Sequence, residues 1–275
     1  LYFQMLLLFL HMNIKKYWKI FWSFRRIQLM KMMEYRSDFW FWLVVSLMWT
    51  AFNYFFYSVI IGNNNNIAGW SYDEVMILLS FFTMIDSITW GVFYPNMIDY
   101  TEAIYEGTLS KFLLQPVNSL FIILTQKITY HNMPRFFIGL FILIGTAIKM
   151  QIEVNIGQIS LAILLFIFAT IFLYSGWFIL ATLSFWVEKL QNINEIMPGF
   201  RHVYQMPVRI YTGATSILFT FIFPLGLVTT LPSEVLLGRS NNSQITYFFI
   251  FTFVFSSLAI LFYKKSIKKY SSVGG

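Results

Sequence analysis

Long apolar stretches separated by short polar segments run along most of the chain. The clearest stretch is Gln158–Val187, thirty residues without a charged side chain. A helix of about 20 apolar residues crosses the hydrocarbon core of a bilayer, so this stretch can span it even when tilted. The whole pattern predicts an all-α polytopic membrane protein with one transmembrane domain, residues 39–263. Its six predicted spans are residues 39–61, 74–94, 134–150, 158–187, 213–231 and 245–263.

The third predicted span is interrupted by charge. Ser119–Ile128 is apolar, but Lys127 and Arg135 break the run that follows it. Pro134 suits the first turn of a helix, where its missing N–H is not needed. The sequence therefore favours a span from Pro134 to Met150, with the preceding stretch at the inner membrane interface.

Proline marks the second and fifth predicted spans. Pro95 closes the second span, and a polar connection follows it. Pro224 lies inside the fifth span, where it removes a helix hydrogen bond. Ser233 and Glu234 then suit the first turn of another short helix. We expect a kinked or re-entrant hairpin at the outer end of span five, with an ordinary kink as the alternative.

Residues 13–38 form a predicted amphipathic helix that lies in the membrane interface. Basic and polar side chains recur three or four residues apart on one face, and aromatic side chains gather on another. The alternative is a soluble helix that caps a partner. The polar face contains Lys16, Lys19, Ser23 and Arg26, and the aromatic face contains Tyr17, Phe21 and Phe24.

The two ends of the chain complete the predicted organisation. Residues 1–12 hold an uncertain start: Leu1-Tyr2-Phe3-Gln4 resembles the remnant of a tag-removal protease site, and the native start is Met5 or Met12. Residues 264–275 form a basic tail, which we expect in the cytoplasm.

The positive charges fall mainly on one side of this topology. Fifteen Lys and Arg residues lie on the side of both termini: seven in the amino-terminal segment, one between spans two and three, three in the long polar connection Glu188–Thr212, and four in the tail. Lys149 and Arg239 lie opposite, and Lys127 and Arg135 belong to the ambiguous third element. The positive-inside rule then places both termini in the cytoplasm.

Composition excludes several functions. The chain is 58% hydrophobic and 11% charged, and it has no cysteine, which excludes disulfides and thiolate metal sites. The net charge of +7 lies beside apolar spans, so it does not indicate nucleic-acid binding. No P-loop, H-E-x-x-H or G-x-S-x-G motif occurs. We therefore expect no cofactor, no metal and no enzyme activity on this chain, with an intramembrane enzyme kept as an alternative.

A charge inside a predicted span is a functional candidate by default. Asp86 lies midway along span two among serine and threonine residues, which suits either a translocation path or a helix-packing hydrogen bond. Two other functions stay open at this point. The chain can be a proton- or ion-coupled secondary carrier that uses Asp86, or an intramembrane lipid-modifying enzyme with a His131–Asp86 pair. A non-transporting scaffold is a further alternative.

Three patches resemble the permeases of type-2 ATP-binding-cassette (ABC) exporters. Glu106–Asn118 is similar to their G-x-L-x-x-x-L-L-x-P-x-N loop after the second span, with Ser110 where many relatives carry an acidic residue. Ile222–Gly238 resembles their I-P…P-[AS]-x-x-L-x-G segment, and Lys268-Lys-Tyr-Ser-Ser272 resembles their terminal R-R-Y-[ST]-S. The segment Glu34–Asp38, before the first span, also resembles the corresponding segment of these permeases.

This resemblance implies a six-span permease that forms a dimeric pore in the cytoplasmic membrane of a bacterial-type cell. A separate ATP-binding subunit, in two copies, would carry ATP and Mg, and a second permease, identical or homologous, would complete the pore. The substrate would be hydrophobic or amphipathic and move by alternating access. The expected path residues in spans two and five are Thr83, Asp86, Thr89, Trp90, Thr215, Phe219 and Thr220.

The loop after span two would couple the permease to its ATP-binding partner. Asp99, Glu102 and Glu106 recur at helical spacing and give an acidic face, and Gly107 can end the helix. The apolar residues that follow would fill a groove on the partner. An ordinary interfacial loop is the alternative. The expected coupling residues are Asp99, Glu102, Glu106, Gly107, Lys111, Phe112, Leu113, Leu114 and Pro116.

Overall fold

A computed structural model describes residues 14–64, 66–153, 155–187 and 193–270 and is almost entirely helical. Within these residues, five helical segments are long and apolar enough to cross a membrane, and one bent pair of helices raises the number to six. The all-α polytopic fold predicted from the sequence is therefore confirmed. The five segments are residues 36–61, 72–105, 130–149, 156–183 and 242–267.

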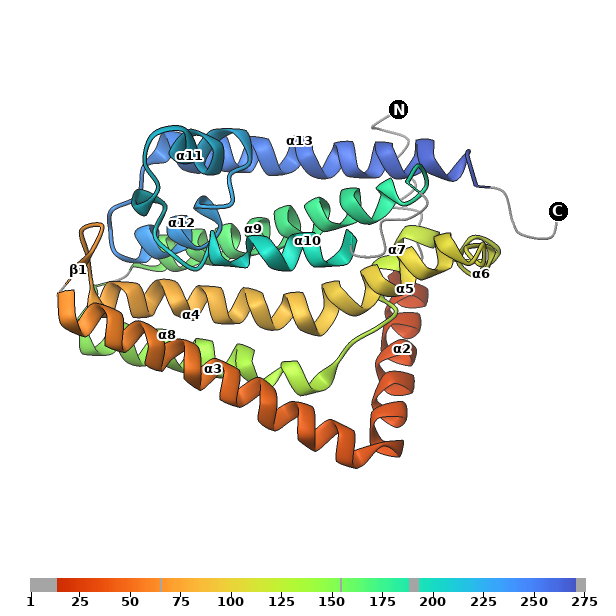
Figure 1. Ribbon diagram of the computed structural model, residues 1–275, viewed down its shortest axis with the longest axis horizontal. Coiled ribbons are helices and arrows are strands. Elements are labelled where there is room, and N and C mark those ends of the chain that lie inside the picture. The colour runs from red at the N-terminus through yellow and green to blue at the C-terminus, as the bar shows by residue number, and fades with distance from the viewer. Residues whose placement is uncertain (1–13, 65, 154, 188–192, 271–275) are drawn as a thin grey trace.

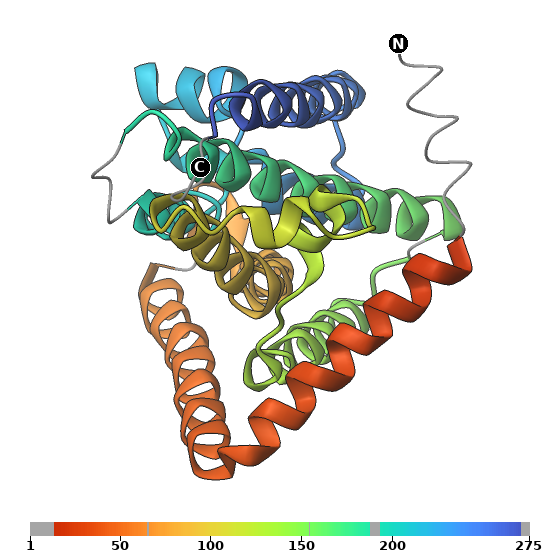
Figure 2. The same ribbon diagram turned by 90° about the vertical axis from the view of Figure 1, so that its right-hand side faces the viewer.

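The first helix lies across one end of the bundle. Helix α2 (Ile14–Glu34) runs nearly perpendicular to the long helices, and α3 (Arg36–Asn64) turns away from it to run along the bundle (Figures 1 and 2). The helices α6 (Ser110–Leu113) and α7 (Ser119–Thr125) gather at this same end, which is called the α2 end below. The short hairpin of β1 (Asn66–Ile67) and β2 (Trp70–Ser71) marks the opposite hairpin end.

The second long helix does not end at Pro95, so that prediction is wrong. Helix α4 (Tyr72–Ile88) passes through a π-helical turn, η1 (Thr89–Phe93), into α5 (Tyr94–Tyr105). Pro95 has no N–H to donate to the Gly91 carbonyl. The backbone N–H of Thr129 donates to that carbonyl instead, with an N···O distance of 2.8 Å. Because this bond replaces the lost one, the helix continues to Tyr105.

The third long helix is α8 (Pro134–Lys149), preceded by a short turn, η2 (Tyr130–Asn132). It begins at Pro134, the residue at which the sequence placed its start. The stretch before it is held against α5, because the Asn96 amide group exchanges two hydrogen bonds of 2.9 Å with the backbone of Lys127. The residues between α7 and α8 are thereby fixed to the middle of the bundle.

Helix α4 is the centre of the molecule. Every residue from Glu74 to Ser87 is buried. Helices α3 and α8 lie on one side of α4, and α9 (Ile156–Leu183), α12 (Leu227–Leu236) and α13 (Asn242–Ile267) lie on the other (Figure 1). A helix surrounded in this way positions any polar side chain it carries inside the bundle.

Gly139 lets α8 approach α4 closely. A Cβ atom at this position would lie 2.9 Å from the Ser80 carbonyl oxygen and 2.9 Å from Met84 Cγ. Small residues at helix contacts are a common means of close packing in membranes. We expect Gly139→Leu to lower the free energy of unfolding by about 1–3 kcal/mol through overpacking.

Thermal unfolding of the purified protein in detergent measures this effect. Gly145→Leu is the matched control on the same helix, because a Cβ atom at Gly145 would meet nothing within 4 Å. Equal melting temperatures for the two variants would contradict the close α4–α8 contact.

The segment predicted as a polar connection, Glu188–Thr212, instead passes along the bundle. Residues 188–192 lie outside the described residues, and α10 (Ile193–Gly199) follows them. Asn194 donates to Thr101 near the α2 end, with an N···O distance of 2.8 Å, and Arg209 pairs with Glu234 toward the hairpin end. The short turns η3 (Phe200–His202) and η4 (Val208–Ile210) lie between these points.

Irregular backbone at this depth needs hydrogen-bond partners from the protein. Helix α12 supplies them: Thr229 Oγ1 donates to the Tyr204 carbonyl at 2.5 Å, and Thr230 Oγ1 accepts from the Val208 N–H at 3.1 Å. Residues 193–210 run from the α2 end toward the hairpin end, so Arg201 and Arg209 do not lie at the α2 end. The prediction that placed them on the side of both termini is wrong.

The predicted fifth span, residues 213–231, is a bent hairpin. Helix α11 (Gly213–Ile217) and the π-helical turn η5 (Leu218–Ile222) meet α12 at an angle of 80°. At the bend, the Phe223 ring lies 5.3 Å from Phe172 in the middle of α9. The chain thus enters the bundle to about half its depth and returns, which supports the re-entrant form of the prediction.

The remaining predicted limits shift by a few residues. Helix α9 begins at Ile156 because Asn155 and Gln158 form a reciprocal cap, and it ends at Leu183. Helix α13 begins at Asn242, where Asn241 caps it, and ends at Ile267. Its last turn contains Lys264 and Lys265. The predictions for residues 1–12 and for the tail beyond Tyr270 fall outside the described residues.

Candidate functional site

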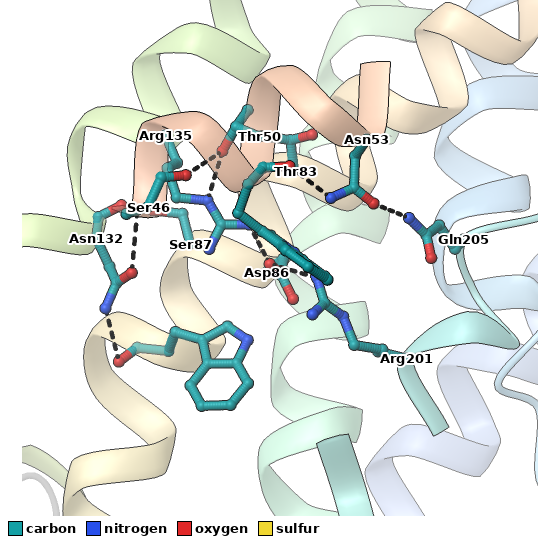
Figure 3. A network of polar contacts seen from close by, with 12 residues as sticks. Ser46, Thr50, Asn53, Thr83, Asp86, Ser87, Asn132, Arg135, Arg201 and Gln205 are labelled. Atoms are coloured by element: carbon teal, nitrogen blue, oxygen red, sulfur yellow. Dashed lines mark hydrogen bonds and ion pairs between the residues drawn. The ribbon is translucent and has the colours of Figure 1, made fainter. Parts of the chain in front are cut away.

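A buried ion-pair cluster lies at the centre of the bundle. The Asp86 carboxylate, on α4, is fully buried and pairs with the guanidiniums of Arg135 from α8 and Arg201 from η3. The distance from Arg201 Nη2 to Asp86 Oδ2 is 3.0 Å, and Arg135 lies closer still to the same oxygen. One carboxylate therefore joins three elements that are far apart in the sequence (Figure 3).

Polar side chains of α3 extend the cluster to a fourth element. Arg135 Nε donates to Thr50 Oγ1 at 2.9 Å, and Gln205 Nε2 donates to Asn53 Oδ1 at 2.6 Å. On the other side, Ser87 donates to the Asn132 backbone carbonyl at 2.7 Å. The result is a polar layer inside the bundle, and Figure 3 shows its side chains.

The charges in this layer do not balance. Two guanidiniums share one carboxylate, which leaves a surplus of one positive charge among these groups. Within the described part of the chain, Asp86 Oδ1 and Arg201 Nε have no hydrogen-bond partner. Arg201 also lies over two aromatic rings, at 5.4 Å from Trp49 and 5.5 Å from Phe82, which partly stabilises its charge.

The predicted His131–Asp86 pair is not formed. Asp86 is occupied by its two arginines, whereas the His131 ring stacks on Trp42 with centroids 6.4 Å apart. A general acid or base must reach the group it serves. The two residues proposed for a lipid-modifying enzyme therefore do not form a catalytic pair here.

The expected path residues do not form one lining. Thr83 and Thr89 are buried within α4 and η1, and Thr83 Oγ1 donates to Tyr54 on α3 at 3.1 Å. Trp90 packs against Tyr94 with ring centroids 4.7 Å apart. The other three lie in the bent hairpin: Thr215 is exposed, Phe219 is half-buried against Tyr211, and Thr220 is buried.

The predicted coupling loop lies at the α2 end, and Gly107 ends α5 as expected. Gly107 has a φ of +66°, a conformation that favours glycine. The N–H of Thr108 donates to the Ala103 carbonyl at 2.9 Å, and the N–H of Gly107 donates to Ile104 at 3.2 Å. These two bonds are the Schellman pattern that closes helices.

The three acidic residues of this loop have different environments. Asp99 is mostly buried and pairs with Lys127 at 2.9 Å and Lys111 at 3.7 Å, so it holds the loop together. Glu102 and Glu106 are exposed on the outer face of α5. The expected acidic face is therefore reduced to two residues available to a partner.

The apolar residues of the loop also divide. Phe112 is only 2% exposed and belongs to the core, so its predicted role as a knob for a partner is wrong. A local pattern cannot tell a side chain that packs inward from one that awaits a partner. Leu113 is half-buried, whereas Leu114 is 85% exposed and Pro116 is exposed beside it. Leu114 is the apolar tip of the loop.

The loop contacts the carboxyl-terminal tail. The Tyr270 hydroxyl donates to the Gly107 carbonyl and accepts from the Ser110 N–H, at 3.3 Å for the second bond. Two patches singled out in the sequence thus meet at one place. The spacing in the sequence carried no signal of this contact, because the two patches are more than 150 residues apart.

Helix α2 is attached to the same loop. Lys16 Nζ donates to the Pro116 carbonyl at 3.0 Å, and the Tyr17 hydroxyl accepts from the Asn118 N–H at 3.2 Å. Further along α2, buried Arg25 donates to the Thr125 carbonyl, and burial lowers the pKa of its guanidinium. The loop, α2 and the tail therefore form one connected surface.

The described residues offer no site for a metal ion, since no group of three His, Cys, Asp or Glu side chains gathers in them. The candidate site is thus a buried charged layer connected by α4 and α5 to an exposed loop. Such an arrangement can transmit movement and hold a charged group, and it contains no assembled catalytic group.

Comparison with known proteins assigns this arrangement to a family. Residues 47–274, most of the chain, match the family described as ABC-2 family transporter protein. No curated protein and no solved structure matches the chain significantly. The match runs from the middle of α3 to beyond α13 and therefore includes both the charged layer and the loop. The chain belongs to the ABC-2 transporter family, and it is a permease component of an ATP-binding-cassette transporter in a membrane.

Proposed function

We propose that this chain is the pore-forming subunit of an exporter. It moves a hydrophobic or amphipathic substrate out of the cytoplasm or the inner leaflet. Two copies of a separate subunit bind ATP with Mg and hydrolyse it, and a second permease, identical or homologous, completes the pore. The proposal is supported by membership of the ABC-2 family together with the surface at the α2 end.

The observation that carries this proposal is the division of the loop into fixed and exposed residues. Asp99 and Phe112 anchor the loop within the protein, whereas Glu102, Glu106 and Leu114 face outward. An apolar tip beside two carboxylates suits a partner groove that is apolar at its base and basic at its rim. A loop that only lies at the membrane interface does not need to be held in place by a buried ring and an ion pair, as this loop is by Phe112 and Asp99.

The helices provide a route from this loop to the centre of the bundle. Helix α5 continues through η1 into α4, so a push on the loop acts along one nearly unbroken rod. Asp86 on that rod is bonded to Arg135 and Arg201, which belong to α8 and to the segment of residues 193–210. Movement driven by ATP binding on the partner would therefore reposition several elements together, as alternating access requires.

The proposed location is the cytoplasmic membrane, with both termini inside. Basic residues remain concentrated at the α2 end even after Arg201 and Arg209 are reassigned, because α2 and the end of α13 both carry several. The positive-inside rule places such an end in the cytoplasm. Helix α2 would then lie in the inner interface, where its exposed Trp18 and Trp22 meet lipid.

A secondary carrier is less consistent with the charged layer. A coupling cation needs a carboxylate that is free to bind it, whereas Asp86 already pairs with two guanidiniums. No contact in the described structure favours this function over the exporter.

Co-purification tests the proposed partnership. The chain is isolated from native membranes in mild detergent, and its partners are identified by mass spectrometry. We expect a P-loop ATPase in two copies for every two permeases, with ATPase activity in the same fraction. Repeated recovery of the chain without an ATPase would refute the proposal.

A further inference from the structure

In the part of the chain that the structure describes, the surplus positive charge at Asp86 has no counterion. Arginine stays protonated in proteins, so the two guanidiniums cannot relieve the excess by losing a proton. In the described structure, the only carboxylate paired with either of them is Asp86. The other groups that the structure places against Arg201 include the Trp49 and Phe82 rings and the Tyr57 and Tyr204 side chains, none of which is a carboxylate.

An unmatched charge within a membrane domain is expensive, so such charges mark functional positions. Cation–π contact with Trp49 and Phe82 offsets part of this cost, typically about 0.5–2 kcal/mol. Burial of a charge costs several kcal/mol per ion. Arg201 also pairs with Asp86, but it shares that carboxylate with Arg135, so the pair does not balance both guanidiniums.

Arg201 is the most accessible of the three charged groups. Its side chain is 12% exposed, against 5% for Arg135 and 1% for Asp86. Its guanidinium lies over the ring of Trp49, which is 44% exposed, whereas its Nε is buried and has no hydrogen-bond partner among the described residues. A ligand that approaches from this side would meet Arg201 first.

The surface beside Arg201 is apolar and aromatic. Met48, Phe52 and Phe56 lie on the same side of α3 as Trp49, at helical spacing, and each is about half exposed or more. The Trp49 and Phe52 rings, and then the Phe52 and Phe56 rings, follow one another at centroid distances of 6.1 and 6.0 Å. This row extends from the arginine along the membrane axis toward the hairpin end.

We propose that Arg201 recognises an anionic headgroup, a phosphate or a carboxylate, of an amphiphile whose apolar chain lies along this row of α3. The headgroup supplies the missing negative charge at the accessible part of the Arg201 side chain, while the apolar chain covers aromatic surface. The same chemistry occurs in a transported substrate and in a bilayer lipid. Binding does not depend on the proposed function; the identification of the amphiphile as substrate rests on it.

Native mass spectrometry of the purified chain in an uncharged maltoside detergent tests the proposal. The probes are a lysophosphatidic acid and the uncharged monoacylglycerol of the same chain length. We expect the phosphate probe to be retained about tenfold more strongly. Arg201→Gln should remove this preference and leave retention of the uncharged probe unchanged, whereas Arg201→Lys should keep most of it.

Lys149→Gln is the control for loss of one positive charge elsewhere, because Lys149 is exposed at the hairpin end. It should leave the preference intact. Equal retention of the two probes by the natural chain, or an undiminished preference in Arg201→Gln, would overturn the proposal. If Arg201→Gln does not fold, the comparison of the two probes on the natural chain and on Arg201→Lys still decides.

A second experiment separates substrate from lipid. The chain is reconstituted with its ATPase in vesicles of uncharged lipid, and ATP turnover is measured with each probe. Stimulation by the phosphate probe alone identifies the headgroup as part of the substrate, and retention without stimulation identifies a bound lipid. Absence of any ATPase partner would refute the proposed function and leave the binding result standing.

Discussion

Replacing Asp86 with alanine is expected to lower the free energy of unfolding by about 3–5 kcal/mol, the usual cost of breaking a buried ion pair by removing one partner. The substitution leaves two buried guanidiniums without a counterion and releases α8 and the segment of residues 193–210 from α4. Thermal unfolding in detergent measures the loss.

Asp73→Ala is the matched control for this prediction. Asp73 pairs with Lys149 at 2.7 Å on the surface, where an ion pair contributes about 0–1 kcal/mol. We therefore expect a much smaller change in melting temperature for this variant. Similar changes for the two variants would show that the cluster at Asp86 does not hold the bundle together.

The double charge reversal Glu102→Lys and Glu106→Lys is expected to abolish most ATP-driven transport without unfolding the permease. Both side chains are exposed at the end of α5, so the protein itself tolerates the change. A partner with a basic rim would be repelled, and like charges placed opposite each other cost several kcal/mol. Transport and substrate-stimulated ATPase activity in reconstituted vesicles are the measurements.

Glu153→Lys serves as the control, because Glu153 is exposed beyond the hairpin end of α8, away from the proposed partner. It should leave transport near the level of the natural chain. If the variant with Glu102 and Glu106 reversed transports normally, the loop is not the coupling element.

Local rules in the sequence predicted much of the helical framework. The uncharged stretch around α9 required a spanning helix on length and composition alone, and Pro134 correctly marked the start of α8. Gly107 likewise closes α5 in the way that glycine favours. Each of these features depends on residues within a few positions of one another, so a single sequence is sufficient to find it.

The segment of residues 193–210 could not be recognised in this way. Its polar residues read as a solvated connection, but Asn194 and Gln205 are buried because Thr101 and Asn53 satisfy them. The second span was ended at Pro95 for a similar reason, since the hydrogen bond that replaces the lost one comes from the distant residue Thr129. In both cases, hydrogen bonds from residues far away in the sequence allow a polar or proline-containing segment to lie inside the helix bundle.

The candidate site was half predicted. The rule that charges within spans are functional candidates selected Asp86, but nothing local indicated that Arg135 and Arg201 would bind it. Arg201 was assigned to the side of both termini because charge counts follow the predicted topology, and the interpretation of residues 188–212 as a polar connection was carried over to it. At the α2 end, the sequence predicted an acidic face, and only the fold separates mostly buried Asp99 from exposed Glu102.

Transport in vesicles that contain the chain with its ATPase tests the central claim most directly. The account predicts that movement of an amphiphilic substrate requires ATP, stops when the ATPase partner cannot hydrolyse it, and continues when an uncoupler removes the proton gradient. Transport by the chain alone, without ATP and abolished by the uncoupler, would contradict the account and establish a secondary carrier.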